Sequence, residues 1–241
     1  MGQDIKHLLA DKQAILFDMD GTLVNSNDLH ASAWSEALNC FGHEISAETV
    51  RPLIGKGGDK LLPELTGIEA ESSDGKKISE ARSKIFIEHY APRVKAFPKA
   101  KELLNQLQTQ GKHIIIATSA SKEELEAILK ASGLEGIFPD MTSADDADAS
   151  KPDPDIIQAA LKKVGVPADQ ALMIGDTPYD VEASILAHTP IIAFRCGGWF
   201  DEDFEGALAV YDGPEEMLTE LNRTPTTSAL QPTPLHGEPT F

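Results

Sequence analysis

Four separate places in the sequence carry residues whose types suit phosphate or metal chemistry. Three of these places directly follow short apolar runs and the fourth is the segment Ser150–Pro152; together they contain Asp18, Asp20, Thr118, Lys151, Asp176 and Asp180. Carboxylate oxygens are the ligands that divalent cations such as Mg²⁺ prefer, and a lysine ammonium or a hydroxyl can hold phosphate oxygens. The set therefore predicts a site for a phosphate group, a metal ion or both.

Each of these residues also has an ordinary structural interpretation when it is taken alone. Asp18 and Asp20 could form a turn, since Asp–Gly is common in turns, and Asp176 and Asp180 could be acids that a helix dipole favours. The lysine could be solvated, and the threonine could cap the end of a strand. A turn does not account for Asp18, because this residue follows apolar strand residues, where a buried charge is costly unless it is paired or metal-bound. The combination favours a site, since separate explanations would all have to apply at adjacent strand ends.

Short apolar runs predict the strands that position these residues, and they span residues 14–17, 113–117, 171–174 and 190–194. Strands that alternate with helices indicate an α/β fold with a Rossmann-like, doubly wound parallel sheet. In such sheets, ligands bind beyond the carboxyl ends of the strands. The polar residues that follow the strands are therefore predicted to lie at one edge of the sheet.

Helical periodicity between the later strands predicts helices over residues 99–108, 121–131 and 154–164, each followed by a glycine suited to a C-terminal cap. Ser121 and Glu124 have the spacing of a capping box at the start of the second of these helices. The segment Ser150–Pro152 is also predicted to open a helix.

One long segment interrupts this alternation of strands and helices. Apolar residues recur at helical spacing through most of residues 27–98, and an ordinary connection between two strands is much shorter. We therefore predict an all-α cap domain over residues 27–96, inserted into a core domain formed by residues 1–26 and 97–222. Residues 223–241, which are rich in Pro, Thr, Ser and Gly and lack periodicity, are predicted to form a disordered tail.

The four polar places resemble the four motifs of the haloacid dehalogenase-like (HAD) superfamily of phosphohydrolases. The segment Asp18–Val24, which reads Asp-Met-Asp-Gly-Thr-Leu-Val, is similar to the first and most specific motif. Thr118 is similar to the second motif, Lys151 within Ser-Lys-Pro-Asp-Pro to the third, and Gly175–Asp176 with Asp180 to the fourth. The resemblance implies a phosphohydrolase whose active site lies where these motifs meet.

The resemblance extends from Ala14 to about Tyr211, and the helical insertion is similar in place and type to the family's cap. Within the superfamily, the segment Asn27–His30 and Trp34 resemble the branch of phosphoglycolate phosphatase and β-phosphoglucomutase. The resemblance implies a Mg²⁺-dependent phosphatase acting on a small phosphorylated metabolite. A β-phosphoglucomutase-like phosphosugar mutase is the alternative. A non-enzymatic binding module on the same scaffold would be expected to lack one of the key acids or the lysine, and all are present.

The family pattern also implies a role for each residue. Asp18 and Asp176 would bind Mg²⁺ through carboxylates and Asp20 through its backbone carbonyl, while Asp180 would orient these ligands or replace one of them. Asp18 would attack phosphorus to form an aspartyl phosphate, and Asp20 would protonate the leaving oxygen and later deprotonate water. Because a dehalogenase lacks the second aspartate, Asp20 favours phosphoryl chemistry over halide chemistry.

The remaining family roles concern the phosphate oxygens and the substrate. Lys151, the hydroxyl of Thr118 and backbone N–H groups near Met19 and Ser119 would hold the non-bridging oxygens in the transition state. Substrate choice is expected to lie in the cap, with candidates Arg51 and Lys56 in a glycine-rich basic stretch, and His30 on the first cap helix. The alternatives are an ordinary interhelical loop for the basic stretch, which lacks the spacing of a P-loop, and a packing role for the histidine.

Composition limits the possible partners. The chain has 21 basic and 39 acidic residues and a net charge of −18, which disfavours nucleic acids and anionic membranes, because binding to them requires Lys and Arg. Its apolar runs are far shorter than the roughly 20 residues of a membrane span, and its start lacks the apolar region of a signal peptide. Cys40 and Cys196 match neither a zinc pattern nor a disulfide framework. We therefore expect a cytoplasmic monomer that acts on small molecules.

Overall fold

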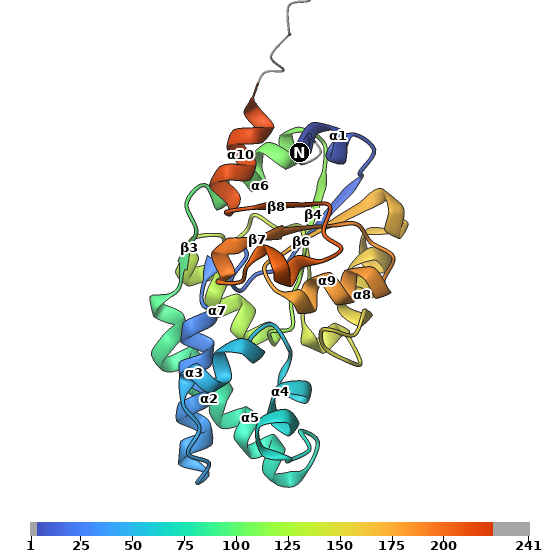
Figure 1. The fold of residues 1–241 in the computed structure, drawn as a ribbon. Helices are drawn as coiled ribbons and strands as arrows, with labels where there is room; N and C mark the ends of the chain where they lie inside the picture. Colours follow the sequence, from blue (N-terminus) through green and yellow to red (C-terminus); the bar gives the residue numbers. More distant parts are fainter. Residues whose placement is uncertain (1–3, 224–241) are drawn as a thin grey trace, which may run out of the picture.

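The computed structural model describes residues 4–223, and a six-stranded parallel sheet forms their centre (Figure 1). The strands lie in the order β5-β4-β1-β6-β7-β8. Their bounds are β1 (Ala14–Phe17), β4 (His113–Ala117), β5 (Asp140–Thr142), β6 (Ala171–Gly175), β7 (Ile191–Phe194) and β8 (Ala209–Tyr211). The fully buried strand β1 pairs in parallel with β4 on one side and β6 on the other.

The predicted parallel α/β sheet is confirmed, and its four predicted strands agree with the structure to within one residue at each end. The two strands that the sequence did not predict, β5 and β8, have three residues each and lie at the two edges of the sheet. An edge strand has one neighbour and is only partly covered, so it needs no long apolar run. This explains why an apolar pattern identified the central strands and missed the outer ones.

Helices cover both faces of the sheet, as a doubly wound fold requires. Alternate residues of β1 point to opposite faces: Ile15 and Phe17 pack in one apolar cluster, whereas Ala14 and Leu16 pack in another. The first cluster includes residues of α1 (Ile5–Ala10), α6 (Ala100–Thr109), α7 (Lys122–Ser132) and α10 (Pro214–Asn222). The second includes residues of α8 (Asp155–Val164) and α9 (Pro178–Leu186).

The segment between β1 and β4 forms a helical unit at one end of the sheet (Figure 1). Its helices are α2 (Asn27–Cys40), α3 (Ala47–Val50), α4 (Gly58–Thr66) and α5 (Ser73–Ile85), with short turns η1 (Arg51–Leu53), η2 (Phe86–Tyr90) and η3 (Ala91–Arg93). A third apolar cluster, which contains Trp34, Leu38 and Leu61, lies within this unit. The helical unit thus has apolar packing of its own.

Two short strands join the helical unit to the sheet. Strand β2 (Val24–Asn25) pairs antiparallel with β3 (Lys95–Ala96), with Val24 opposite Ala96. The chain therefore leaves the sheet and returns to it at the same place. Two-residue strands carry too little pattern to be recognised from sequence.

Several predicted local features differ from the structure. The Ser121 side chain caps α7 by accepting from the Glu124 backbone N–H, but the Glu124 side chain pairs with Arg82, so only half of the predicted capping box forms. No helix begins at Ser150–Pro152, because α8 starts later, at Asp155. The remaining short turns are η4 (Ala144–Asp146), η5 (Ala168–Gln170), η6 (Arg195–Gly197) and η7 (Asp201–Phe204).

Two further predictions concern the chain ends and membranes. The predicted disordered tail lies outside the described residues from position 224 onward. Within residues 4–223, every helix is too short or too polar to cross a lipid bilayer.

Candidate active site

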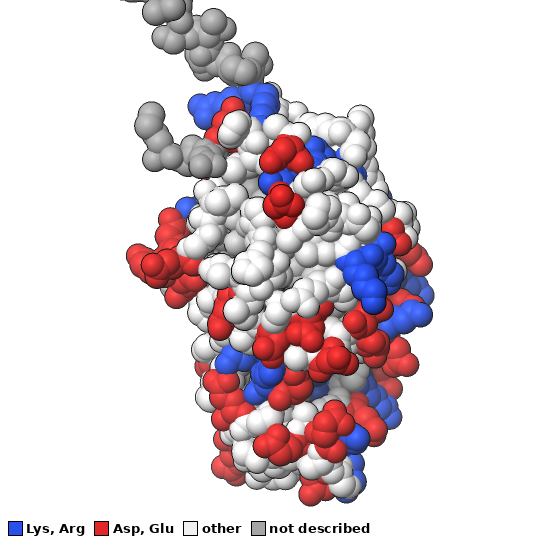
Figure 2. All heavy atoms as spheres, turned by 90° about the vertical axis from the view of Figure 1, so that its right-hand side faces the viewer, with Lys and Arg blue, Asp and Glu red and all other residues white. Residues whose placement is uncertain are grey.

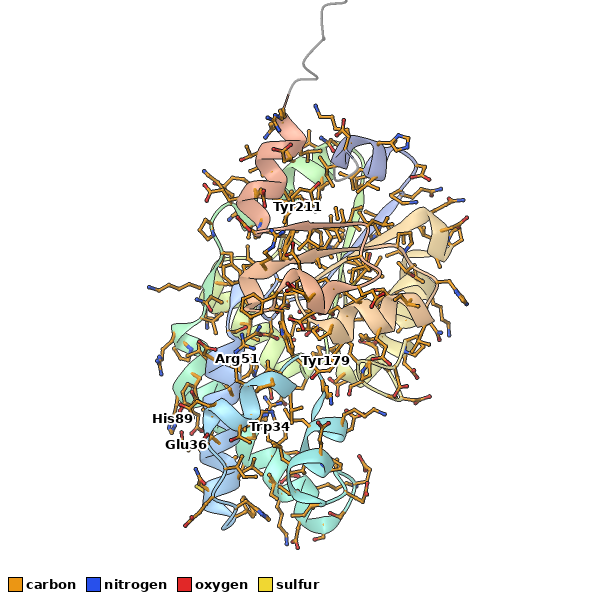
Figure 3. All side chains as sticks on the ribbon, in the orientation of Figure 1. Trp34, Glu36, Arg51, His89, Tyr179 and Tyr211 are labelled. Carbon is orange, nitrogen blue, oxygen red and sulfur yellow. The ribbon has the colours of Figure 1, made fainter. Side chains whose placement is uncertain are left out.

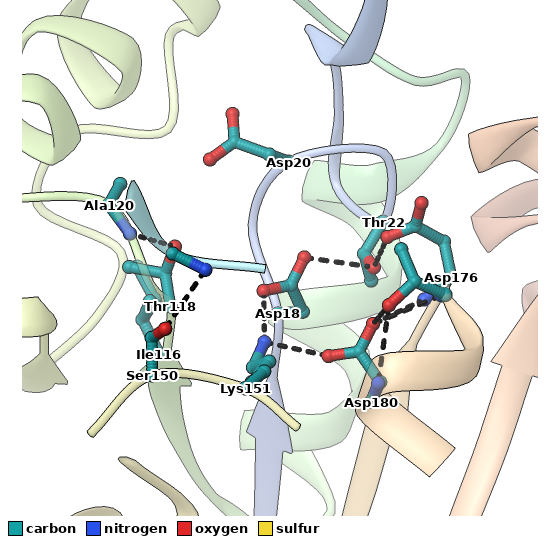
Figure 4. A network of polar contacts seen from close by, with 12 residues as sticks. Asp18, Asp20, Thr22, Ile116, Thr118, Ala120, Ser150, Lys151, Asp176 and Asp180 are labelled. Carbon is teal, nitrogen blue, oxygen red and sulfur yellow. Dashed lines mark hydrogen bonds and ion pairs between the residues drawn. The ribbon is translucent and has the colours of Figure 1, made fainter. Parts of the chain in front are cut away.

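The carboxyl ends of the three central strands bring the predicted polar residues together. Phe17 at the end of β1 lies opposite Ile116 of β4 and Ile174 of β6. The next residues along these strands lead directly to Asp18, Thr118 and Asp176 at one edge of the sheet. The in-register pairing of parallel strands therefore places side chains that are about a hundred residues apart in sequence around one point (Figure 4).

Lys151 lies at the centre of this group. Its Nζ is 2.5 Å from Asp18 Oδ1 and 2.7 Å from Asp180 Oδ1, and its side chain is 1% exposed. Burial by itself lowers the pKa of Lys151, but the two adjacent carboxylates outweigh burial and hold this pKa above its usual range. The solvated interpretation of Lys151 is therefore wrong, and the residue is a buried ammonium ion.

Asp176 joins the two carboxylates that pair with this ammonium to form a buried acidic cluster. Oxygens of Asp18, Asp176 and Asp180 all lie within 4.8 Å of one another. Burial and the neighbouring carboxylates raise the pKa of Asp18 to about 7, against the opposing effect of Lys151, and they raise the pKa of Asp176 well above its ordinary value. With all three carboxylates ionised, one ammonium would leave an excess of buried negative charge, and the raised pKa values of Asp18 and Asp176 reflect the cost of that state. The arrangement fits a divalent cation with oxygen ligands, because such a cation would compensate the excess.

The Asp176 side chain is fixed by residues that the sequence did not single out. Thr22 Oγ1 donates to Asp176 Oδ1 at 2.8 Å, and Asn27 Nδ2 donates to Asp176 Oδ2 at 2.9 Å. A Cβ atom at Gly197 would lie only 1.7 Å from Asp176 Oδ2, so this position must be glycine. Thr22 and Asn27 both lie in segments that resemble the family. This location was the only feature of the sequence that could have identified them as site residues.

Asp180 contacts both the start of a helix and the buried lysine. Its Oδ2 accepts from the Thr177 N–H at 3.0 Å and the Thr177 hydroxyl at 2.7 Å, which forms a capping box at the start of α9. Its Oδ1 pairs with Lys151. The helix cap therefore holds Asp180 in a fixed orientation beside the ammonium.

Asp20 points away from the buried carboxylates and toward the helical unit (Figure 4). Its Oδ1 accepts from Ser26 Oγ at 2.5 Å and lies 2.9 Å from His30 Nε2. Burial raises the pKa of Asp20, but His30 and Ser26 more than offset burial, so this pKa lies below its ordinary value. The His30 ring stacks on Phe86, with ring centroids 3.8 Å apart. His30 therefore packs within the helical unit and also contacts the site.

The predicted phosphate-binding groups near Asp18 also include Thr118, Ser119 and Met19. Thr118 Oγ1 accepts from the Ala120 N–H at 3.1 Å, and the buried Ser119 Oγ has no hydrogen-bond partner among the described residues. The Met19 side chain is fully buried in the apolar core, so only its backbone is available to a ligand.

A small cavity of about 50 Å³ lies between these residues and the helical unit, and residues from both sides line it. The sheet side contributes Asp18, Asp20, Thr118, Ser119, Ala120 and Glu124. The helical unit contributes His30, Trp34, Ile54, Gly55, Lys56, Gly57, Gly58 and Arg82. A molecule bound to Asp18 would therefore also contact the helical unit.

The two basic residues predicted from the glycine-rich stretch differ in position. Lys56 lines the cavity, where its Nζ is 2.5 Å from Glu64 Oε2 and 4.9 Å from the centre of the Tyr179 ring. Arg51 is not among the residues that line the cavity; it pairs with Asp28 at 2.6 Å and donates to the Gly197 carbonyl. Figure 3 shows Arg51 and Tyr179 where the helical unit meets the sheet domain. Arg51 thus connects the two parts.

Sequence reasoning missed one pair of cavity residues, Arg82 and Glu124. Arg82 stands in a charged helical stretch that looks like a solvated surface, and Glu124 was assigned to a helix cap. In the structure, Arg82 Nη1 and Glu124 Oε2 are 2.7 Å apart. Only the packing of α5 against the sheet domain brings these residues together, so the sequence contains no local signal for the pair.

One known protein family matches most of this chain. A family model described as "Haloacid dehalogenase-like hydrolase" matches residues 15–194. The chain belongs to this family. The predicted resemblance and the predicted hydrolase class are thereby confirmed.

Several members of the haloacid dehalogenase-like family are similar to this chain. Phosphoglycolate phosphatase from Rhodospirillum rubrum is 32% identical over 213 residues, which cover 83% of this chain and 87% of that protein. Protein SUPPRESSOR OF QUENCHING 1 from Arabidopsis thaliana is 34% identical over 186 residues, which cover 76% of this chain but only 18% of that protein. A crystal structure of a hydrolase from Pseudomonas syringae has a TM-score of 0.81 and 31% identity, and covers 87% of this chain and 98% of that one.

Proposed function

We propose that the chain is a Mg²⁺-dependent phosphatase that hydrolyses small phosphate monoesters through an aspartyl-phosphate intermediate. The observation that carries the proposal is the buried Asp18 carboxylate, which contacts the Lys151 ammonium and faces a cavity of about 50 Å³. The relatives support the same class of reaction, since one of them is a phosphoglycolate phosphatase.

The excess of buried negative charge supports Mg²⁺ as the cofactor. Asp18 and Asp176 would hold the ion through carboxylates and Asp20 through its backbone carbonyl, while Asp180 would orient them or replace one. When bound, Mg²⁺ would neutralise charge so that a carboxylate can approach a phosphate dianion.

The residues of the chain divide the reaction into two steps. In the first step, a carboxylate oxygen of Asp18 forms a bond to phosphorus, the ester P–O bond breaks, and Asp20 gives a proton to the leaving oxygen. In the second step, Asp20 takes a proton from a water molecule that attacks phosphorus, which releases phosphate and restores Asp18. The lowered pKa of Asp20 suits the second step, because its ionised form is the base.

Lys151 and Thr118 would stabilise the phosphoryl group while it is transferred. The ammonium is fixed between Asp18 and Asp180, and the Thr118 hydroxyl lies at the end of the neighbouring strand. Backbone N–H groups near Met19 and Ser119 would complete the set of donors. Such preorganised donors stabilise charge that is spread over the non-bridging oxygens in the transition state.

We propose further that residues 27–96 act as a cap domain on a core of residues 1–26 and 97–222. The separate apolar cluster of the helical unit and the paired strands β2 and β3 support this division. The cap would exclude water from the site, with hinges at the two strands. Lys56 and His30 are the predicted cap residues that line the cavity, and they are proposed to contact substrate.

The proposed setting is the cytoplasm, where the chain would act as a monomer on free small molecules. Figure 2 shows acidic side chains spread along one face of the molecule, and among the described residues of this face the basic side chains form no continuous surface. A net charge of −18 also disfavours nucleic acids. Light scattering after size-exclusion chromatography tests the monomer directly.

One assay tests the proposed activity. The protein is incubated with p-nitrophenyl phosphate and Mg²⁺, with and without EDTA, and then with glucose phosphates, while free phosphate and isomerised sugar are measured. We expect phosphate release that EDTA abolishes. A phosphosugar mutase would share the aspartyl phosphate but return the phosphoryl group to a sugar, so isomerisation without phosphate release would contradict a phosphatase.

A further inference from the structure

An ion pair joins the helical unit to the sheet domain at the wall of the cavity. Arg82 comes from α5 and Glu124 from α7, and their side chains are 14% and 2% exposed. Burial raises the pKa of Glu124, but Arg82 and His30 outweigh burial and hold this pKa below its ordinary value of 4.5. Both partners are therefore charged, and the pair as a whole is neutral.

The guanidinium of Arg82 is held in place but is not saturated with acceptors. Its carbon Cζ lies 4.9 Å from the centre of the Trp34 ring, and Nη1 donates to Glu124. The Nε donor is buried and has no hydrogen-bond partner among the described residues. A buried donor without a partner is costly, so this position suits an acceptor that a ligand would bring.

The pair shares the cavity with the residue proposed to act on the leaving group. Arg82 and Glu124 line the same space as Asp20 and His30. Asp20 is the proposed acid for the leaving oxygen, and its side chain points toward the helical unit, away from Lys151 (Figure 4). The group attached to that oxygen must therefore extend toward Arg82 and Glu124.

We propose that Arg82 and Glu124 form a specificity-determining pair that selects a leaving group with neutral hydroxyls and rejects one with a second anion. This inference rests on the proposed phosphatase activity and names its substrate class, a phosphorylated polyol. A hydroxyl both donates and accepts, so it can accept from Arg82 and donate to the Glu124 carboxylate. A carboxylate or phosphate can only accept, and it would lie beside the ionised carboxylate of Glu124.

The pair also explains how the cavity could reject a substrate that the positive charge of Arg82 would otherwise attract. Arg82 Nη1 lies 2.7 Å from Glu124 Oε2, so the carboxylate balances the charge of the guanidinium. The Glu124 carboxylate is itself buried in the cavity wall, where it would repel a second anion. Rejection by a like charge is the repulsive component that specificity commonly requires. Removal of the Glu124 charge should therefore turn Arg82 into an anion-binding residue.

Glycerol 3-phosphate and 2-phosphoglycolate provide a test, because their leaving groups are both small and differ in charge. For the full-length protein with Mg²⁺, we expect kcat/KM for glycerol phosphate to exceed that for phosphoglycolate by about tenfold or more. Glu124→Gln should reduce this ratio about tenfold, chiefly through a lower KM for phosphoglycolate. Glu123→Gln, which alters the exposed neighbouring residue, should leave the ratio at the wild-type value.

A double variant, Arg82→Gln with Glu124→Gln, shows whether the gain in affinity for phosphoglycolate that is expected of Glu124→Gln depends on Arg82. It contains no unpaired buried charge, so it provides the test even where circular dichroism shows that Glu124→Gln is unfolded. We expect it to lose affinity for glycerol phosphate without gaining affinity for phosphoglycolate. A wild-type preference for phosphoglycolate, or a wild-type substrate ratio in the folded variants, would overturn the specificity pair alone. Absence of phosphate release from both esters and from p-nitrophenyl phosphate would instead overturn the phosphatase.

Discussion

The carboxyl edge of the sheet and the facing wall of the helical unit both contain buried charges, but they balance these charges differently. At the sheet edge, Asp18, Asp176 and Asp180 form a buried cluster, and the ammonium of Lys151 pairs with the first and the last of them. At the facing wall, one guanidinium meets one carboxylate. The sheet edge therefore has an excess of negative charge that suits a cation, whereas the wall is neutral and suits an uncharged polar group.

This difference separates two tasks of a single cavity. The sheet edge would perform the chemistry that is common to every phosphate ester, and the wall would distinguish one leaving group from another. Motifs that the sequence displays form the first region, and a contact between distant elements forms the second. Changes of charge confined to one region should therefore have effects that differ in kind and in size.

The largest effect is expected from Asp18→Asn, because this change removes the nucleophile of the sheet edge. We expect kcat for p-nitrophenyl phosphate to fall about 10³-fold or more. The protein should remain folded, since burial disfavours the charge that is lost. Phosphate release and far-UV circular dichroism measure the two quantities, and substantial turnover by a verified Asp18→Asn protein would remove Asp18 from its proposed role.

Lys151→Met removes the ammonium that pairs with Asp18 and Asp180 at the sheet edge. Loss of one partner from a buried ion pair leaves charges uncompensated, and typically costs about 3–5 kcal/mol of unfolding free energy. Urea unfolding without Mg²⁺ measures the change. Lys163→Met is the matched control, because Lys163 also pairs with an acid but at a more exposed position. Equal stability losses in both variants would show that the buried ammonium has no special role.

Mg²⁺ should stabilise the fold through the excess charge of the sheet edge. Saturation at about 100 times Kd would add about 2.7 kcal/mol, which appears as a higher unfolding temperature. Asp176→Asn should reduce this gain, and Asp169→Asn, at an exposed position, should not. The same Mg²⁺ response in both variants would place the ion elsewhere.

The smallest effect concerns pH and the cavity wall. The pKa of Glu124 in the folded protein lies below the ordinary value of 4.5, so the ionised carboxylate stabilises the fold above that pH. This contribution is lost as pH falls through the folded pKa. Unfolding free energies of the wild type and Glu124→Gln, measured between about pH 3 and about pH 6, should therefore converge toward the acidic end. Parallel curves would contradict an ionised Glu124.

The sequence was sufficient to predict the central strands and the residues at their ends. Continuous apolar runs such as 14–17 arise because the central strands are buried on both faces, and the change to polar residues directly after them marks the edge of the sheet. The short edge strands lacked such a run. Sequence could not decide whether Asp180 is a helix-terminal acid or a site residue. In the structure, one of its oxygens caps α9 and the other contacts Lys151.

The facing wall could not be predicted in the same way. Arg82 and Glu124 are 42 residues apart and come from helices of different parts of the molecule. Neither helix contains a local pattern that identifies the partner, and Glu124 also fitted a capping box. Arg51 was selected for its charge and sequence context, but the structure places it at the contact between the two parts, where it pairs with Asp28.

The most direct measurement is a rapid-quench experiment with ³²P-labelled substrate and wild-type protein, followed by peptide mapping. A nucleophilic Asp18 predicts that a labelled phosphoryl group appears on the peptide containing Asp18 before free phosphate accumulates, and that hydroxylamine releases it. Release of phosphate with no protein-bound label at any time, or a label on a different residue, would contradict the role of the sheet edge proposed above.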